Sequence, residues 1–142
     1  MSVEANTAFV DTNILVYAFA EDDPHRHELA RRLVEQLTEA GTLRLSTQVL
    51  QEFFVTATSK ARKPMSRDDA IRRMDYLSEW LKHTTNYSAI REAVLLSTEA
   101  IISFWDALIV VAASRSGAAI LYTEDLNHGQ KLLGVTIVNP FK

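Results

Sequence analysis

The sequence predicts an α/β fold with a mostly parallel central sheet covered by helices on both faces, a three-layer α/β/α sandwich. Short apolar runs, such as Ala8-Phe9-Val10 and Ala119-Ile120-Leu121-Tyr122, are closed by polar residues, as is typical of buried parallel strands. Longer stretches with helical spacing separate these runs. The length of 142 residues fits one domain, and we expect residues 1–142 to form it.

The first third of the chain predicts a strand and two helices. The strand at residues 8–10 leads into Asp11-Thr12-Asn13, which can cap a helix beginning at Ile14. Asp23 and Pro24 have the pattern of an N-cap followed by proline at the first helical position, and the next glycine is Gly41. We therefore expect a helix over residues 24–40.

The middle of the chain predicts a second strand at residues 43–46, followed at once by a helix that buries Val49, Leu50, Phe53 and Ala57. A basic loop is expected at residues 60–64. Ser66 and Asp69 then resemble a capping box at the start of a further helix. That helix is expected to bury Ala70, Met74, Leu77 and Leu81.

The last third predicts two helices and two strands. One helix covers residues 88–99 and buries either Ile90, Val94 and Leu95 or Ala93 and Leu96. A helix that is apolar nearly all round begins after Ser103 and ends by Gly117, so we expect it to be buried. Strands are expected at residues 119–123 and 135–138.

Composition limits the class of protein. The net charge of −3 argues against a protein that coats nucleic acid through bulk positive potential. The absence of cysteine excludes disulfides, thiolate zinc sites and a cysteine nucleophile. No apolar run has the length of a membrane span, and residues 1–5 lack the pattern of a secretory signal. We therefore expect a cytoplasmic protein that does not associate with membranes.

Four carboxylates predict a metal site. Asp11 and Asp125 each follow a predicted strand, and Glu52 and Asp106 each lie early in a predicted helix. Functional groups of a parallel sheet gather at the carboxyl ends of its strands. Two such charges about 4 Å apart repel by roughly 4 kcal/mol at an effective dielectric constant near 20, so a cation is expected. Oxygen ligands favour Mg²⁺ or Mn²⁺ over zinc, and the chemistry expected of such an ion is phosphodiester hydrolysis.

Each acid also has a purely structural explanation. Asp11 can cap a helix, and Asp106 is spaced from Ser103 as in a capping box. Asp125 can be a turn residue, and Glu52 can be a solvated helix residue. The joint pattern favours the site.

Other polar and aromatic residues receive structural interpretations. Six basic residues between positions 60 and 73 either face phosphates or form a solvated surface; they are Lys60, Arg62, Lys63, Arg67, Arg72 and Arg73. His128 is expected to be a loop residue rather than a ligand. Trp80 and Trp105 are expected to pack in the core rather than to stack on bases. The sequence has no glycine-rich nucleotide fingerprint, Walker loop or G-x-S-x-G motif.

Four segments, in order along the chain, resemble the PIN domain family and, within it, the VapC-like toxins of prokaryotic toxin-antitoxin pairs. The segments are Asp11-Thr12-Asn13-Ile14-Leu15, Ser46-Thr47-Gln48-Val49-Leu50-Gln51-Glu52-Phe53, Phe104-Trp105-Asp106-Ala107-Leu108-Ile109 and Thr123-Glu124-Asp125-Leu126-Asn127. The resemblance covers almost the whole chain. One departure is that the segment after Asp125 lacks the aromatic residue found in many relatives.

The resemblance implies a Mg²⁺- or Mn²⁺-dependent endoribonuclease, commonly a homodimer, that an antitoxin protein holds inactive while also binding operator DNA. It implies that Asp11 and Asp106 ligate the metal directly. Glu52 and Asp125 would act through water or a second ion and help to orient the attacking water. Thr12, Asn13 and Thr123 match positions that support the site by hydrogen bonding.

Two alternatives from other classes remain. A phosphatase or phosphoacceptor would use Asp11 as its nucleophile, but it needs a lysine that the ends of the later strands do not supply. A catalytically silent PIN-like scaffold would only bind RNA or protein, which leaves the repulsion among four retained acids unexplained.

Overall fold

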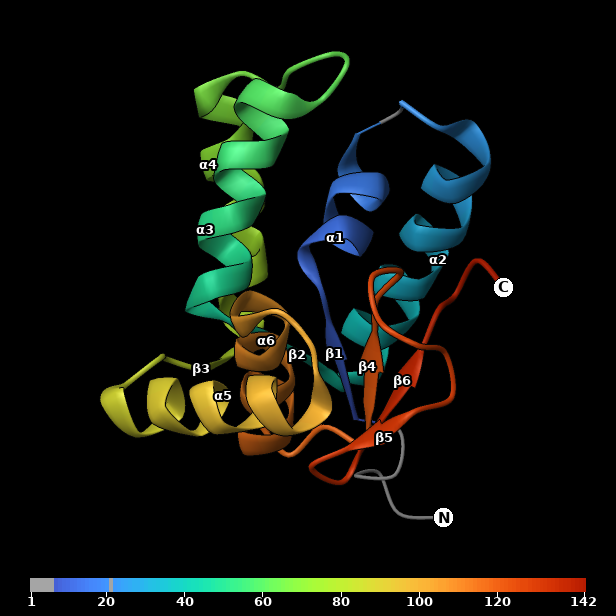
Figure 1. Ribbon diagram of the computed structural model, residues 1–142. Helices are drawn as coiled ribbons and strands as arrows, with labels where there is room; N and C mark the ends of the chain where they lie inside the picture. The colour runs from blue at the N-terminus through green and yellow to red at the C-terminus, as the bar shows by residue number, and fades with distance from the viewer. Residues whose placement is uncertain (1–6, 21) are drawn as a thin grey trace.

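The computed structural model describes residues 7–20 and 22–142 and contains a six-stranded sheet in the order β3-β2-β1-β4-β6-β5 (Figure 1). Its strands are β1 (Ala8–Val10), β2 (Leu43–Ser46), β3 (Leu81–His83), β4 (Ile120–Tyr122), β5 (Lys131–Leu132) and β6 (Val135–Val138). All neighbouring strands pair in parallel except β5, which runs antiparallel to β6. The predicted mostly parallel sheet is confirmed.

Helices cover both faces of the sheet, which confirms the three-layer sandwich (Figure 1). They are α1 (Thr12–Phe19), α2 (Pro24–Ala40), α3 (Thr47–Val55), α4 (Arg67–Leu77), α5 (Tyr87–Ala100) and α6 (Phe104–Arg115). Helix α6 contacts β2, β4 and β6, and α5 packs against α6. Helix α2 contacts β2, and α1 packs against α2. Helices α3 and α4 pack together and project from the sheet (Figure 1).

The strand order fixes where a site can form. The chain moves outward in one direction from β1 to β2 and β3, then returns to place β4 on the other side of β1. The connections therefore diverge beyond the carboxyl ends of β1 and β4, which is where open α/β sheets bind ligands. Asp11 directly follows β1, and Thr123 directly follows β4.

Short polar side chains cap the N-termini of α2 and α4 at the residues that the sequence predicted. Asp23 accepts a hydrogen bond from the Arg26 amide at the start of α2, and Ser66 accepts one from the Asp69 amide at the start of α4. Gly41 ends α2 in the left-handed conformation, with φ of 70°, which glycine adopts without strain. The predicted helix over residues 24–40 is therefore confirmed.

The core is formed by the sheet together with α1, α2, α3, α5 and α6. Residues 107–113 of α6 are all buried, as their apolar sequence predicts. In α5 the buried residues are Ala89, Ala93 and Leu96, which confirms the second of the two predicted faces and leaves Ile90, Val94 and Leu95 exposed.

Some predictions about local structure were wrong. Strands β3 and β5 were not predicted because three and two residues are too short to show a periodic pattern. Leu81 belongs to β3 rather than to α4. Asn86, and not Ser88, caps α5 by accepting a hydrogen bond from the Ala89 amide. After α3 the chain continues through a π-helical turn, η2 (Thr56–Lys60), and a 3₁₀ turn, η3 (Ser78–Trp80), precedes β3.

The two tryptophans differ in environment. Trp80 is half-buried and packs against the core, as predicted. Trp105 is 61% exposed, so its predicted core position was wrong. Trp105 lies in the first turn of α6, one residue before the acid Asp106 and ahead of the buried part of the helix.

Among the described residues, no single helix is long and apolar enough to cross a membrane. Helices α5 and α6 have the required length and composition only as a pair, and the pair is bent by 117°. The residues on which we based the absence of a secretory signal, 1–5, lie outside the described part of the chain.

Candidate active site

Asp11 lies where β1 passes into α1, and its carboxylate is buried, with 6% of the residue exposed. The Thr12 amide donates a hydrogen bond of 2.7 Å to its Oδ1, and the Thr123 hydroxyl donates one of 2.8 Å to its Oδ2. Asp11 therefore caps α1, as the structural explanation predicted. The bond from Thr123 also joins the ends of the two central strands.

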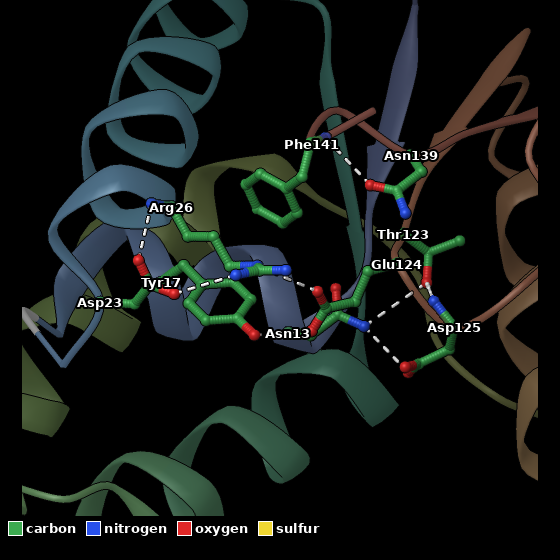
Figure 2. Close-up of polar contacts among 9 residues, drawn as sticks. All are labelled: Asn13, Tyr17, Asp23, Arg26, Thr123, Glu124, Asp125, Asn139 and Phe141. Carbon is green, nitrogen blue, oxygen red and sulfur yellow. Dashed lines mark hydrogen bonds and ion pairs between the residues drawn. The ribbon is translucent and has the colours of Figure 1, made fainter.

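Asp125 lies on the loop after β4 and is held by α1 (Figure 2). The Asn13 amide donates a hydrogen bond of 2.9 Å to its Oδ2. Thr123 Oγ1 accepts a bond of 3.1 Å from the Asp125 backbone amide. Asn13 and Thr123 thus fix the loop that carries Asp125, and their roles in supporting a site remain predictions.

Glu52 reaches the same region from the second turn of α3. Its Oε1 accepts a hydrogen bond of 3.2 Å from the Thr12 hydroxyl, so α1 and α3 are joined beside Asp11. Gln48 lies one turn earlier and donates a bond of 3.3 Å to the Trp105 carbonyl, which ties α3 to the start of α6. These two bonds place three helices around one opening.

Asp106 is in the first turn of α6. Ser103 Oγ accepts a hydrogen bond of 3.0 Å from the Asp106 amide, which confirms the N-terminal cap. The carboxylate itself is half-buried and faces the opening shared with the other acids. A structural role for the Asp106 backbone and a place for its side chain in the cleft thus coexist.

All four predicted acids line one cleft of about 570 Å³. This acidic cleft also contains the predicted supporting residues Thr12 and Asn13, whereas Thr123 lies buried beneath it. Sequence reasoning missed several lining residues, although a spacing of one helical turn from Glu52 could have indicated the first of them. The missed residues are Gln48, Gln51, Trp105, Asp22, Val16, Tyr17, Val55, Thr56, Ala61 and Ile109.

The model of the PIN domain family matches residues 8–131, most of the chain. The chain belongs to the PIN domain family. The match confirms the family resemblance seen in the sequence, and it spans all four segments that carried the resemblance.

A solved structure has the same fold as this PIN domain. It is the crystal structure of VapBC2 from Rickettsia felis bound to a DNA fragment from their promoter, and the matched chain is 21% identical with a TM-score of 0.62. The match covers 92% of this chain and 96% of that one. No curated protein matches the sequence closely enough to count as a relative.

Of the six basic residues singled out in the sequence, Lys60 lines the acidic cleft of the PIN domain. The backbone amides of Arg62 and Lys63 donate hydrogen bonds to the Asp22 carboxylate. Arg67 and Arg73 lie over the rings of Phe54 and Phe19, and Arg72 pairs with Asp69. The stretch is therefore mostly a solvated surface, with one cation at the cleft.

Neighbouring polar residues keep Glu124 away from the other acids. The Tyr17 hydroxyl donates a hydrogen bond of 2.7 Å to Glu124, and Arg26 lies 3.5 Å from its second oxygen (Figure 2). The guanidinium also stacks over the rings of Tyr17 and Phe141. Asp125 is therefore the acid of this loop that faces the cleft. His128 accepts a bond from the Asn139 amide and behaves as the predicted loop residue.

Burial and mutual repulsion disfavour ionised carboxylates in the cleft of the PIN domain. Burial raises the pKa of Asp11 to about 7, and repulsion from Asp125 and Glu52 adds to the rise. The hydrogen bonds from Thr123 and Thr12 lower this pKa but do not offset the effect of burial. Burial also raises the pKa of Glu52 and of Asp106, and Asp125 repels both. These shifts are opposite to those expected for carboxylates that lie close to a cation, and Lys60, the basic side chain that lines the cleft, is not among their causes.

The donor atoms of the cleft fit a hard divalent cation. Besides the carboxylates, Asn13 Oδ1 and Gln48 Oε1 are buried oxygens without a hydrogen-bond partner. Within residues 7–20 and 22–142, no group of three or more His, Cys, Asp or Glu side chains is arranged to hold one ion directly. Mg²⁺ commonly takes one or two carboxylates and keeps several waters, which this set of oxygens allows.

Proposed function

We propose that this PIN domain is a Mg²⁺- or Mn²⁺-dependent endoribonuclease that hydrolyses RNA phosphodiester bonds. The observation that carries the proposal is the convergence of Asp11, Glu52, Asp106 and Asp125 from four separate segments on one cleft. Burial and, to a smaller extent, mutual repulsion raise the pKa values of Asp11, Glu52 and Asp106, and a divalent ion would relieve the repulsion. No structural role requires all four acids at the same place.

Each acid has a proposed task. Asp11 and Asp106 would ligate the metal directly, because one is fixed by two hydrogen bonds and the other is anchored on a capped helix. Glu52 and Asp125 would act through water and orient the nucleophile. When bound, the ion supplies charge neutralisation at the phosphate and a bound water of lowered pKa.

We further propose that the chain is the toxin of a toxin-antitoxin pair and works in the cytoplasm. The sequence resembles VapC-like toxins, and a chain of similar fold occurs in the VapBC2 structure with promoter DNA. An antitoxin protein is the partner expected from this likeness. A homodimer is supported by three apolar side chains that α5 exposes, Ile90, Val94 and Leu95.

The phosphoacceptor alternative gains no support from the strand ends, since the residues after β4 and β6 are Thr123 and Asn139 rather than lysine. Lys60 does line the cleft, but it lies in the π-helical turn after α3. A covalent aspartyl phosphate on Asp11 would favour that alternative. RNA binding without cleavage in any divalent metal would favour a silent scaffold.

The test is incubation of purified protein with total cellular RNA in Mg²⁺, Mn²⁺ or EDTA, followed by mapping of new 5′ ends. Asp106→Asn is the active-site variant, and Asp75→Asn, an exposed acid of α4 outside the cleft, is the matched control. The proposal predicts that the wild type and Asp75→Asn cleave RNA at discrete positions in Mg²⁺ or Mn²⁺ and do not cleave it in EDTA. Cleavage that continues in EDTA or in Asp106→Asn would overturn it.

A further inference from the structure

Trp105 is exposed on a helix whose middle is buried. The seven residues from 107 to 113 of α6 are buried, yet 61% of Trp105 faces solvent. Its neighbour Phe104 packs against the core, so the two aromatic side chains of this turn have different environments. Core packing therefore explains Phe104 but not Trp105.

The exposed indole lies in the acidic cleft rather than on a remote surface. Trp105 lines the same cleft as Asp11, Glu52 and Asp106, and it directly precedes Asp106 in the chain. A ligand whose phosphate is bound at the acids through a divalent ion would thus have an aromatic surface beside it. The cleft volume of about 570 Å³ is within the range of sites that hold small organic groups.

The backbone and ring of Trp105 are supported from two sides. Its carbonyl accepts a hydrogen bond of 3.3 Å from Gln48, whose side chain is buried. Its ring meets Phe104 edge to face, with centroids 5.0 Å apart and planes at 74°. A tryptophan anchored in this way loses little conformational freedom when another ring stacks on it.

We propose that Trp105 stacks on an unpaired nucleobase next to the scissile phosphate and so anchors the RNA strand in the cleft. This inference rests on the proposed ribonuclease function. A base inside a duplex has both faces covered by its neighbours, whereas an unpaired base offers a free face to an aromatic side chain. Lys60, on the same cleft, supplies a cation for an adjacent phosphate.

The chain contains two tryptophans, which makes the test direct. In the Asp11→Asn/Trp80→Phe protein, Trp105 is the remaining tryptophan, and the loss of Asp11 is expected to prevent cleavage. Tryptophan fluorescence is measured in the presence of Mg²⁺ while an unlabelled 12-nucleotide single-stranded RNA is added. The titration is then repeated with the same RNA annealed to its complement. The matched control is Asp11→Asn/Trp105→Phe, in which only Trp80 reports.

Saturable quenching of Trp105 by the single strand, with little by the duplex and none of Trp80, supports the inference. In the Asp11→Asn background, Trp105→Ala is expected to weaken single-strand binding by roughly 10-fold or more, and Trp105→Phe by less, as measured by the anisotropy of labelled RNA. Because Trp105 is exposed, neither change should unfold the protein, which thermal melting will check.

The anisotropy measurement separates two kinds of failure. If labelled RNA binds without quenching Trp105, or binds Trp105→Ala as tightly as the parent, the stacking inference is wrong while the proposed function stands. If RNA binds neither these variants nor the wild-type protein, both are wrong. Equal quenching by single strand and duplex would contradict stacking of Trp105 on an unpaired base.

Discussion

Thr123 Oγ1 lies 2.8 Å from Asp11 Oδ2, so the ends of β1 and β4, 112 residues apart in the chain, are joined by a hydroxyl that donates to a buried carboxylate. The same hydroxyl accepts a bond from the Asp125 amide and lies 3.5 Å from Asn13 Nδ2. A single buried side chain thus aligns two of the four acids.

Replacing Thr123 by valine is expected to reduce the rate of RNA cleavage and the affinity for Mn²⁺ by roughly 10- to 100-fold, as for other residues that orient metal ligands. Valine has nearly the same shape but cannot donate to Asp11 or accept from Asp125. Thr123→Ser keeps the hydroxyl and should retain most activity. Equal losses in the valine and serine variants would indicate that only packing matters.

The pKa of Asp11 predicts how the stability of the metal-free protein depends on pH. Its folded value of about 7 exceeds the ordinary value of 3.8, so the folded state binds the proton more tightly than the unfolded state. This contribution to stability is complete below pH 3.8 and is lost as the pH rises through 7. The size of the loss is on the order of 4 kcal/mol.

Asp11→Asn should therefore raise the melting temperature in EDTA at pH 8 by several degrees and make stability less dependent on pH between 4 and 8. Mg²⁺ should stabilise the wild type at pH 8 but have little effect on this variant. Thermal melting across pH, with and without EDTA, measures both effects. A variant less stable than the wild type at pH 8 in EDTA would show that the carboxylate is not a source of instability.

Lys60 is expected to contact RNA through phosphate. Lys60→Gln should weaken binding of single-stranded RNA and reduce the slope of log Kd against log salt concentration by roughly 0.7. Lys82→Gln, on the exposed edge strand β3 and outside the cleft, is the matched control and should change neither quantity. Salt titrations by fluorescence anisotropy measure the slope, and identical slopes for both variants would exclude the contact.

A water nucleophile predicts that the RNA 2′-hydroxyl is not needed for cleavage. Histidine is not among the described residues that line the cleft, and the proposed nucleophile is a water that Glu52 and Asp125 would orient. An RNA with one 2′-deoxy substitution at the mapped site should still be cut, without a cyclic phosphate product. Loss of cleavage in this substrate would point to attack by the 2′-hydroxyl instead.

The sequence indicated that the four acids lie together because Asp11 and Asp125 follow strands while Glu52 and Asp106 lie early in helices, and the topology of a parallel sheet brings such positions together. The sequence also indicated that Asp11 caps a helix and that Asp106 is the third helical residue after the cap Ser103, and the structure confirms both. The catalytic and metal-binding roles of the four acids remain predictions.

The errors have physical reasons. Trp105 was assigned to the core because the helix that follows it is apolar on all sides, but the first turn of α6 lies beyond the sheet and opens to the cleft. Gln48 was not singled out because its role depends on the distance between α3 and α6, which no local pattern encodes. Strands β3 and β5 form through pairing with β2 and β6 rather than through their own sequence.

The rate of cleavage of one single-stranded RNA, measured against Mn²⁺ concentration for the wild type, Asp11→Asn and Asp75→Asn, tests the central claim most directly. The account predicts saturable metal dependence for the wild type and Asp75→Asn, and a rate lower by about 100-fold or more for Asp11→Asn at every concentration. Metal-independent cleavage, or equal rates for Asp11→Asn and the wild type, would contradict it.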